Sequence, residues 1–342
     1  MLTETPAGLY CPAGDFYIDP WGAVPRAVIT HAHGDHARFG SDAYLCAAGC
    51  APLLQRRFGP GAAIQAVAYG ESMSLGGVRV SLHPAGHVLG SAQVRLEHEG
   101  RVWVVSGDYK RAADPTCAAF DVVPCDTFVT ESTFGLPIYR WDATSAVIDE
   151  IMAWWRGNAA HGLTSVIFCY TIGKVQRLLA ELALVTDARV FVHGMMLSMI
   201  ELYRDAGIAM LPTTPLIDRP RGTSFAGELV LAPLSARGTP WMRRLGELSD
   251  GFASGLMRVR GVRRQRAYDR GFVISDHADW PALLQTIMET GAQRVLATHG
   301  HAEALARFLG EQGLSSGTLR TAWEGEAAAE SDAPIESTAE QP

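Results

Sequence analysis

Apolar and polar positions along this chain follow two kinds of pattern. Short runs rich in β-branched and aromatic residues predict strands, and they recur between longer stretches with helical periodicity. The strand-like runs occupy residues 26–30, 101–106, 127–130, 165–170, 189–193, 229–232, 271–275 and 294–298. The helix-like stretches lie around residues 143–155, 173–184, 280–290 and 302–309. Because the two kinds alternate without an internal repeat, the pattern predicts an α/β fold.

The first strand-like run ends in a cluster of metal-ligand side chains. Residues 30–36 read THAHGDH, so His31, His33, Asp35 and His36 lie within six residues. Imidazole nitrogen suits zinc and its first-row neighbours, and a carboxylate lets one ligand set address two adjacent cations. A polar loop with incidental histidines is the weaker interpretation, because neutral histidine has no packing reason to recur at this spacing. The segment therefore predicts a metal site at a strand-to-loop junction.

Four other strand-end loops offer groups of the same kind. They supply His87 in the loop at 85–91, Asp108 after Ser-Gly, His277 after Ser-Asp, and His299 before a glycine. A lone histidine beside glycine is more often a hydrogen-bonded turn residue than a ligand. Taken together, however, these loops favour one shared site, because open α/β sheets present their chemistry where strands end.

Length and composition limit the class of protein. With 342 residues, 48% of them hydrophobic, the chain is long enough for one large domain or two ordinary ones. No stretch approaches the roughly 18 apolar residues of a membrane span, and the first residues lack a signal-peptide pattern. We therefore expect a cytoplasmic protein without membrane contact. Six scattered cysteines fit reduced thiols better than disulfides, and a zinc role for Cys46 and Cys50 has little support.

The formal charge of −7 is concentrated at the end of the sequence. Residues 324–342 hold six acids and no base in an Ala/Ser/Pro context, which predicts a disordered acidic tail at 323–342. Without these six of the 36 acids, 30 acids face 29 bases, so the folded body is near neutral. Its cations are almost all arginine, with Lys110 and Lys174 as the only lysines. Arginine binds phosphate better than lysine because its guanidinium can donate two parallel hydrogen bonds, although a GC-rich genome explains the excess of arginine equally well.

The sequence Glu-Ser-Thr-Phe-Gly at 131–135 completes a set of motifs with the 30–36 cluster, the 85–91 loop and the Ser-Gly-Asp turn at 106–108. Together they resemble the metallo-β-lactamase-fold nucleases that carry a β-CASP domain. This family includes pre-mRNA 3′-end endonucleases and DNA crosslink-repair exonucleases. The specific resemblance, from about Leu9 to about Thr321, is to bacterial ligase-associated DNA damage response exonucleases, often encoded beside an ATP-dependent DNA ligase and a helicase.

The resemblance implies an αββα sandwich with an inserted cap. Residues 1–145 would form the first part of the metallo-β-lactamase domain, 146–268 the β-CASP cap, and 269–322 the second part. It also assigns the ligands: His31, His33 and His87 to a first metal, Asp35, His36 and His299 to a second, and Asp108 to both. Asp19 corresponds to the carboxylate that orients the cluster.

The resemblance gives catalytic roles to Asp35, His277 and Glu131. Glu131 and His277 match the first two β-CASP motifs, and His299 matches the third. We expect His277 to protonate the leaving oxygen or hold a phosphate oxygen, with Glu131 keeping it charged and oriented. The alternative for Glu131 is a carboxylate that caps a turn.

Candidate nucleic-acid contacts lie in the implied cap. Residues 170–177 run from a strand into a helix and would offer backbone N–H groups and Lys174 to a phosphate, although a plain strand-to-helix turn explains them equally well. The spacing is not that of a nucleotide-binding P-loop. Six arginines lie within thirteen residues: Arg258, Arg260, Arg263, Arg264, Arg266 and Arg270. They would line a path for a phosphodiester backbone or else form a solvated face, and Trp241 and Tyr268 would stack on bases or belong to the core.

The predicted function is metal-dependent hydrolysis of DNA phosphodiesters, on single-stranded or end-processed DNA in repair, by a hydroxide that two metals activate. Zinc is the default metal and manganese the alternative. The nearest competing function is RNA cleavage by the same fold, because the distinction depends on how the groove treats a 2′-hydroxyl. A small-molecule hydrolase would explain the ligands but not Glu131, His277 or the arginine-rich cap. A scaffold without catalysis is disfavoured because every expected ligand position is filled.

Overall fold

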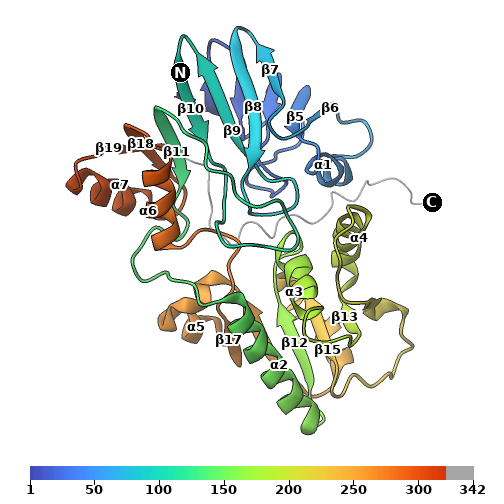
Figure 1. Cartoon of the computed structure of the whole chain (residues 1–342). Helices are drawn as coiled ribbons and strands as arrows, with labels where there is room; N and C mark the ends of the chain where they lie inside the picture. The colour runs from blue at the N-terminus through green and yellow to red at the C-terminus, as the bar shows by residue number, and fades with distance from the viewer. Residues whose placement is uncertain (321–342) are drawn as a thin grey trace.

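Three sheets organise the computed structural model, which describes residues 1–320 apart from the side chain of Arg263 (Figure 1). The predicted acidic tail at 323–342 lies outside the described residues. The first sheet has the order β1-β2-β3-β4-β5-β6. Its strands are β1 (Thr3–Thr5), β2 (Gly8–Cys11), β3 (Phe16–Ile18), β4 (Arg26–Val28), β5 (Ala43–Ala47) and β6 (Ile64–Val67). Strands β1 to β3 pair antiparallel and β3 to β6 pair parallel.

The second sheet faces the first, in the order β19-β18-β11-β10-β9-β8-β7. Its strands are β7 (Ser72–Leu75), β8 (Val78–Pro84), β9 (Ala92–His98), β10 (Arg101–Val105), β11 (Thr127–Glu131), β18 (Arg294–Thr298) and β19 (Ser315–Thr318). Apolar side chains from both sheets, including Val28 and Leu45 from one and Val94 and Val129 from the other, form one buried core. This pairing of sheets is what brings the ends of their strands to one edge.

Helices cover the outer faces of these two sheets. Helix α1 (Ala51–Phe58) buries Leu53 and Leu54 against the first sheet. Helices α6 (Trp280–Glu289) and α7 (Ala302–Glu311) bury Leu283 and Leu305 against the second. The result is a four-layer arrangement of helix, sheet, sheet and helix, which fills the upper half of Figure 1.

The third sheet is entirely parallel, with the order β14-β13-β15-β12-β16-β17. Its strands are β12 (Thr164–Phe168), β13 (Val190–Val192), β14 (Thr213–Pro215), β15 (Leu229–Ala232), β16 (Leu248–Ala253) and β17 (Arg270–Phe272). Helices α2 (Thr144–Ala160), α3 (Lys174–Leu182) and α4 (Leu197–Asp205) contribute to the core on one face, and α5 (Arg260–Arg266) precedes β17. Strands β12 and β15 are buried throughout, as the unbroken apolar run of β15 predicts; β12 begins with the two polar residues Thr164 and Ser165, which are buried as well.

The third sheet interrupts the second in the sequence, because all its strands lie between β11 and β18. It occupies the lower half of Figure 1, below the strand ends of the other two sheets. Its last strand, β17, lies beyond the boundary expected at residue 268, since its pairing with β16 keeps it in the third sheet. Among residues 1–320, no helix is long and apolar enough to cross a membrane.

Candidate metal centre

The ends of β3 and β4 build one side of the candidate site. These strands are parallel neighbours, so Asp19 after β3 and Thr30 after β4 meet at the same sheet edge. Asp19 adopts a positive φ of 44°, and its carboxylate accepts hydrogen bonds from Thr30 N at 2.8 Å, Thr30 Oγ1 at 2.6 Å and His36 Nδ1 at 2.7 Å. The carboxylate thus fixes both ends of the segment that carries the clustered histidines, as expected of an orienting residue.

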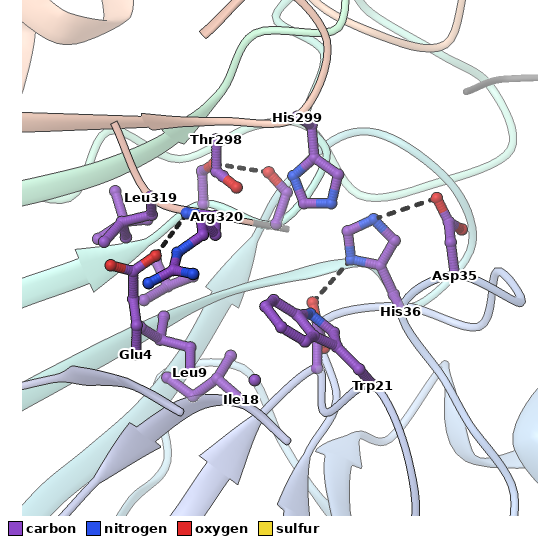
Figure 2. Close-up of a pocket in the computed structure, with 16 residues that line it drawn as sticks. Glu4, Leu9, Ile18, Trp21, Asp35, His36, Thr298, His299, Leu319 and Arg320 are labelled. Carbon is purple, nitrogen blue, oxygen red and sulfur yellow. Dashed lines mark hydrogen bonds and ion pairs between the residues drawn. The ribbon is translucent and has the colours of Figure 1, made fainter. Parts of the chain in front are cut away.

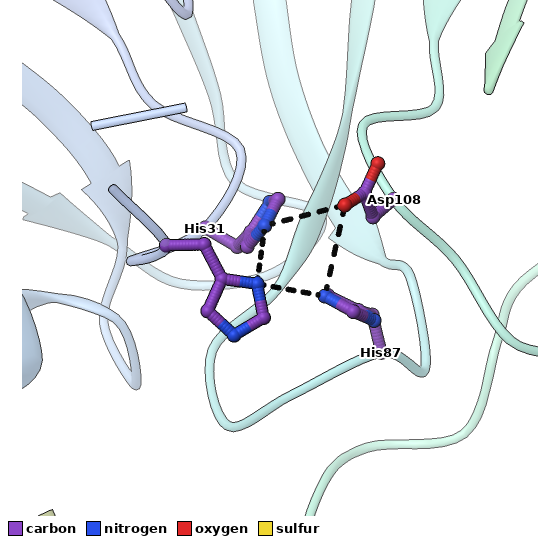
Figure 3. Close-up of side chains that lie close together, drawn as sticks. His31, His87 and Asp108 are labelled. Atoms are coloured by element: carbon purple, nitrogen blue, oxygen red, sulfur yellow. Dashed lines mark hydrogen bonds and ion pairs between the residues drawn. The ribbon is translucent and has the colours of Figure 1, made fainter. Parts of the chain in front are cut away.

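Three imidazoles converge in the buried interior of this edge. His33 Nδ1 lies 3.1 Å from His31 Nε2 and 3.2 Å from His87 Nε2, and each ring stands nearly perpendicular to the other two. Figure 3 shows His31, His87 and Asp108 directed toward one another. Ligand atoms about 2.0–2.1 Å from a tetrahedral ion lie about 3.3–3.4 Å apart. The spacing of the three nitrogens is therefore close to that of three ligands around one cation.

In each of these three rings, one nitrogen points away from the other two histidines. The hydrogen-bond partner of this outer nitrogen decides which nitrogen of the ring carries the proton. A carbonyl oxygen can only accept, so His33 Nε2 donates to Ile172 O at 3.2 Å and His87 Nδ1 donates to Asp276 O at 2.8 Å. The Thr30 hydroxyl gives its proton to a carboxylate and so accepts from His31 Nδ1 at 3.0 Å. Each ring therefore presents an unprotonated nitrogen to the centre.

The three unprotonated nitrogens that face the centre indicate whether a metal ion fits there. Three unprotonated nitrogens at this separation repel one another unless a cation lies between them, and outer partners of this kind are typical of metal-binding histidines. Burial lowers the pKa of His31 and of His87 well below the usual range, which favours the neutral rings that a metal requires. The first ligand set fits a divalent ion.

Asp108 lies between the two expected ligand sets. Its Oδ2 is 3.6 Å from His31 Nε2, 3.9 Å from His87 Nε2 and 3.4 Å from His36 Nε2. His299, in a left-handed backbone conformation with φ 59°, stacks on His36 with ring centroids 4.9 Å apart. The Asp35 carboxylate lies 3.8 Å from His36 Nε2. The structure thus brings all seven predicted ligands together, with Asp108 between the two sets.

The second ligand set has unsatisfied buried atoms. Within the described residues, Asp35 Oδ1, His36 Nε2 and Asp108 Oδ1 are buried without a hydrogen-bond partner. Burial disfavours the charged form of His36, but the carboxylates of Asp108 and Asp35 outweigh it and raise the pKa of His36 well above its usual range. Burial lowers the pKa of His299 to about 4. Two carboxylates facing His36 provide the negative charge that a second cation needs.

Glu131 and His277 form a buried pair beside Asp108. His277 Nδ1 lies 2.9 Å from Glu131 Oε2 and 3.8 Å from Asp108 Oδ2. The other Glu131 oxygen accepts a hydrogen bond from Tyr109 N at 2.6 Å, so this carboxylate makes both the histidine contact and the turn contact considered for it. Trp141 Nε1 donates to the His277 carbonyl oxygen at 2.9 Å and fixes the backbone there.

Two cavities reach the ligand cluster from different sides. One is lined by Asp35, His36 and His299 together with apolar residues of the N-terminal strands, and Figure 2 shows His36 and His299 facing Trp21 across it. The other, on the side of the third sheet, is lined by His33, Asp35, His87, Asp108, Thr133, Tyr170, Ile172, Lys174, Asp276 and His277. Because His277 lines only the second of these two, a group that it protonates would enter from the side of the third sheet.

Lys174 does not lie free for a phosphate, contrary to the expectation from residues 170–177. Its side chain is buried, and its Nζ lies 2.9 Å from Asp276 Oδ2 and donates to Ile274 O at 3.0 Å. Its charge is therefore already paired with a buried carboxylate inside the protein. The sequence could not reveal this because both partners lie about 100 residues away.

The arginine cluster divides into exposed and occupied members. Arg260, Arg264 and Arg270 are exposed, and the side chain of Arg263 lies outside the described part. Arg258 pairs with Asp142 at 3.1 Å, and the Arg266 guanidinium lies 5.2 Å from the centre of the Phe252 ring. The three exposed arginines are accessible to a nucleic-acid backbone, and the phosphate path stays a prediction.

The two aromatic candidates already have partners. Tyr268 stacks on Phe252 with ring centroids 5.2 Å apart, and Trp241 packs edge-on against His193 at 4.8 Å. Stacking on a base would compete with these contacts. Cys46 and Cys50 are fully buried, and a hydrogen bond between them together with burial raises the pKa of the Cys50 thiol well above its usual range, which disfavours a zinc-binding thiolate.

Comparison with known proteins supports the superfamily that the motifs suggested. No protein-family model matches the chain. It is 31% identical over 315 residues to a "Probable DNA ligase" of Opitutus terrae, across 90% of this chain and 30% of that protein. It is 31% identical over 121 residues to "Endoribonuclease ysh-1" of Neurospora crassa, covering 34% of this chain and 14% of the relative. An "RNase J-like protein" of Methanocaldococcus jannaschii is 26% identical over 113 residues, or 32% of this chain and 27% of the relative.

The chain spans less than a third of the length of each of these relatives. The nuclease names support the metallo-β-lactamase/β-CASP superfamily and an enzyme of the metal-dependent hydrolase class. A crystal structure of a protein of unknown function from Enterococcus faecalis V583 matches with a TM-score of 0.56 at 11% identity, over 88% of this chain and 80% of the other. That likeness shows a shared fold.

Proposed function

We propose that this chain is a metal-dependent phosphodiesterase that hydrolyses DNA, with the third sheet and its helices as a β-CASP cap over a two-metal site. The observation that carries the proposal is the convergence of inward, unprotonated nitrogens from His31, His33 and His87 on Asp108, with outer nitrogens held by acceptors. The best-supported pair of ions is zinc, with manganese as the alternative for the mixed carboxylate and imidazole set.

The chain's own residues would divide the work. His31, His33 and His87 would hold one cation, Asp35, His36 and His299 the other, and Asp108 both. When bound, two such ions lower the pKa of a shared water and neutralise charge on the phosphate. His277, on the cap side of Asp108, would give a proton to the leaving oxygen, and Glu131 at 2.9 Å would keep that ring oriented.

DNA is favoured over RNA by the similarity to the Opitutus protein. It extends over 90% of this chain and lies within a protein whose name is that of a DNA ligase. The proposal includes a function in DNA repair in the cytoplasm, beside an ATP-dependent ligase and a helicase. The name of the Opitutus protein supports only the part that concerns a DNA ligase. The competing function, RNA cleavage, is supported by the shorter similarities to proteins named as endoribonucleases and as RNase J-like.

Digestion of end-labelled strands tests the proposal. Single-stranded DNA and RNA of one sequence are incubated with metal-free protein resupplied with Zn²⁺, Mn²⁺ or Mg²⁺. We expect DNA cleavage that Asp35→Ala abolishes, whereas the exposed neighbour variant Asp42→Ala cuts like the parent. His277→Ala should retain its metals and lose about 10²-fold or more in rate. Cleavage of RNA alone would replace DNA by RNA, and cleavage of neither would refute the nuclease assignment.

A further inference from the structure

Two of the three histidines of the first ligand set are held by parts of the chain far from them in sequence. His33 Nε2 donates to the carbonyl oxygen of Ile172, in the loop before α3. His87 Nδ1 donates to the carbonyl oxygen of Asp276, in the segment after β17. Both acceptors are backbone atoms, so the directions of these rings depend on where residues 172 and 276 are held.

Helix α3 holds the second of these segments through two buried cations. Lys174 Nζ contacts Asp276 Oδ2 at 2.9 Å and Ile274 O at 3.0 Å. Arg177 Nη1 contacts Asp276 Oδ1 at 3.0 Å and Ser275 O at 2.5 Å. Because Lys174 and Arg177 are three residues apart, they lie on one face of the helix and hold three consecutive residues together.

The same network has a second branch, which runs from Arg177 through Asp114 to Lys110. Arg177 Nε lies 3.3 Å from Asp114, which pairs with Lys110 Nζ at 2.9 Å. All of these side chains are buried. Burying three cations with two carboxylates contributes little to the free energy of unfolding, so stability alone does not explain this network. Lys110 and Lys174 lie at the two ends of the network, and of these two lysines Lys174 is the one whose side chain contacts the 274–276 segment.

We propose that Lys174 and Arg177 are positioning residues for the first metal site, so that the affinity of His31, His33 and His87 for a metal ion depends on the seating of α3. The inference rests on the proposed metal centre. Lys174 lines the cavity beside the ligands, but the contacts of both cations described above are with residues 274–276. Each would act through the Asp276 carbonyl oxygen and hence through the His87 ring. The helix carries the Ile172 loop at its own start, so one displacement of α3 would disturb two ligands.

The paired substitutions Lys174→Gln and Lys110→Gln separate positioning from general effects. Each removes one positive charge from the same buried network, so each should cost similar stability and change the field at the metal in the same direction. Loss of an outer-shell partner typically weakens metal binding about 10–100-fold, and we expect that loss for Lys174→Gln and a change within about twofold for Lys110→Gln. Lys174→Arg, which keeps the charge and a donor, should restore much of the affinity.

Titration of the metal-free proteins with Co²⁺ or Zn²⁺ against a chromophoric chelator measures these affinities, and thermal unfolding of the same samples measures stability. Equal weakening in the two glutamine variants, or none in Lys174→Gln, would overturn the inference while leaving the metal centre intact. Failure of the unsubstituted protein to bind either ion would instead refute the proposed function.

Hydrogen exchange on the unsubstituted protein provides a test that does not depend on a variant folding. If the metal and α3 are coupled, metal binding must slow exchange at the amides of 174–182 and 274–277, because linkage is reciprocal. The amides of β7, at 72–75, which pair with β8 at the edge of the second sheet, serve as the internal control and should change little. Equal protection of α3 and β7, or none at α3, would contradict the coupling.

Discussion

Replacing Asp19 by asparagine tests the orienting role that the structure gives this carboxylate. Asp19 accepts three hydrogen bonds, two of them from Thr30 and one from His36. Asparagine has the same shape but carries a donor in place of one oxygen. Whichever way the amide turns, its NH₂ group faces at least one N–H donor, either Thr30 N or His36 Nδ1. The substitution therefore breaks a contact without creating a cavity.

The expected magnitude follows from these contacts. A hydrogen bond to a charged acceptor contributes about 1.5–3 kcal/mol, so Asp19→Asn should lower the free energy of unfolding of the metal-free protein by roughly 2–3 kcal/mol. Loss of an orienting group weakens metal binding about 10–100-fold, equivalent to about 1.4–2.8 kcal/mol. We expect the larger effect at the site that contains His36, because its ring loses its own partner.

Metal content after equilibrium dialysis against buffered free Zn²⁺ measures the effect. At a free concentration that just fills both sites of the parent, Asp19→Asn should hold about one ion instead of two. Asp15→Asn is the matched control. Asp15 directly precedes β3, the strand that Asp19 follows, and it also has a positive φ, of 51°. Its contacts with Tyr10 and Arg26 are exposed. Two ions bound with parental affinity in Asp19→Asn would refute the orienting role.

Three further substitutions test the loop, the buried network and the nucleic-acid path. Gly86 and Gly100 both have φ near +74°, but a Cβ at Gly86 would lie 2.3 Å from a backbone oxygen and one at Gly100 meets nothing within 4 Å. Urea unfolding should show Gly86→Ala to be less stable than Gly100→Ala by about 1–3 kcal/mol, and equal losses would contradict the packing. Burial opposes ionisation of Asp114, but Lys110 and Arg177, which pair with it, lower its pKa. The stability that Asp114 contributes is therefore present above about pH 4 and is lost as the pH falls through the pKa of the folded state. Asp114→Asn should therefore flatten the acid limb of stability below pH 4, and an unchanged limb would contradict the pairing. If the exposed Arg264 contacts a phosphate, Arg264→Gln should reduce the slope of log affinity for single-stranded DNA against log salt concentration by about 0.7, as measured by fluorescence anisotropy. An unchanged slope would show that Arg264 does not belong to the predicted phosphate path.

The apolar pattern predicted part of the strands and helices, but it missed β8 and β9, which have seven residues each and are largely buried. The apolar runs at 101–106, 127–130 and 229–232 are β10, β11 and β15, because burial on a sheet requires such runs. The short β1 and β7 were not predicted, since Thr3–Thr5 and Ser72–Leu75 are edge strands with exposed positions and contain few apolar residues. Their pairing is decided by neighbouring strands and not by their own composition.

The sequence by itself determined which side chains would form the candidate site. Residue type and the rule that parallel strands end at one edge were sufficient to select His31, His87, Asp108 and His299 from distant loops. Only the tertiary structure decided which nitrogen of each ring faces inward and that Lys174 is an internal partner rather than a surface cation. The reason is physical: these outcomes depend on backbone carbonyl oxygens and buried carboxylates brought in by folding, and every residue carries the same carbonyl whatever its side chain.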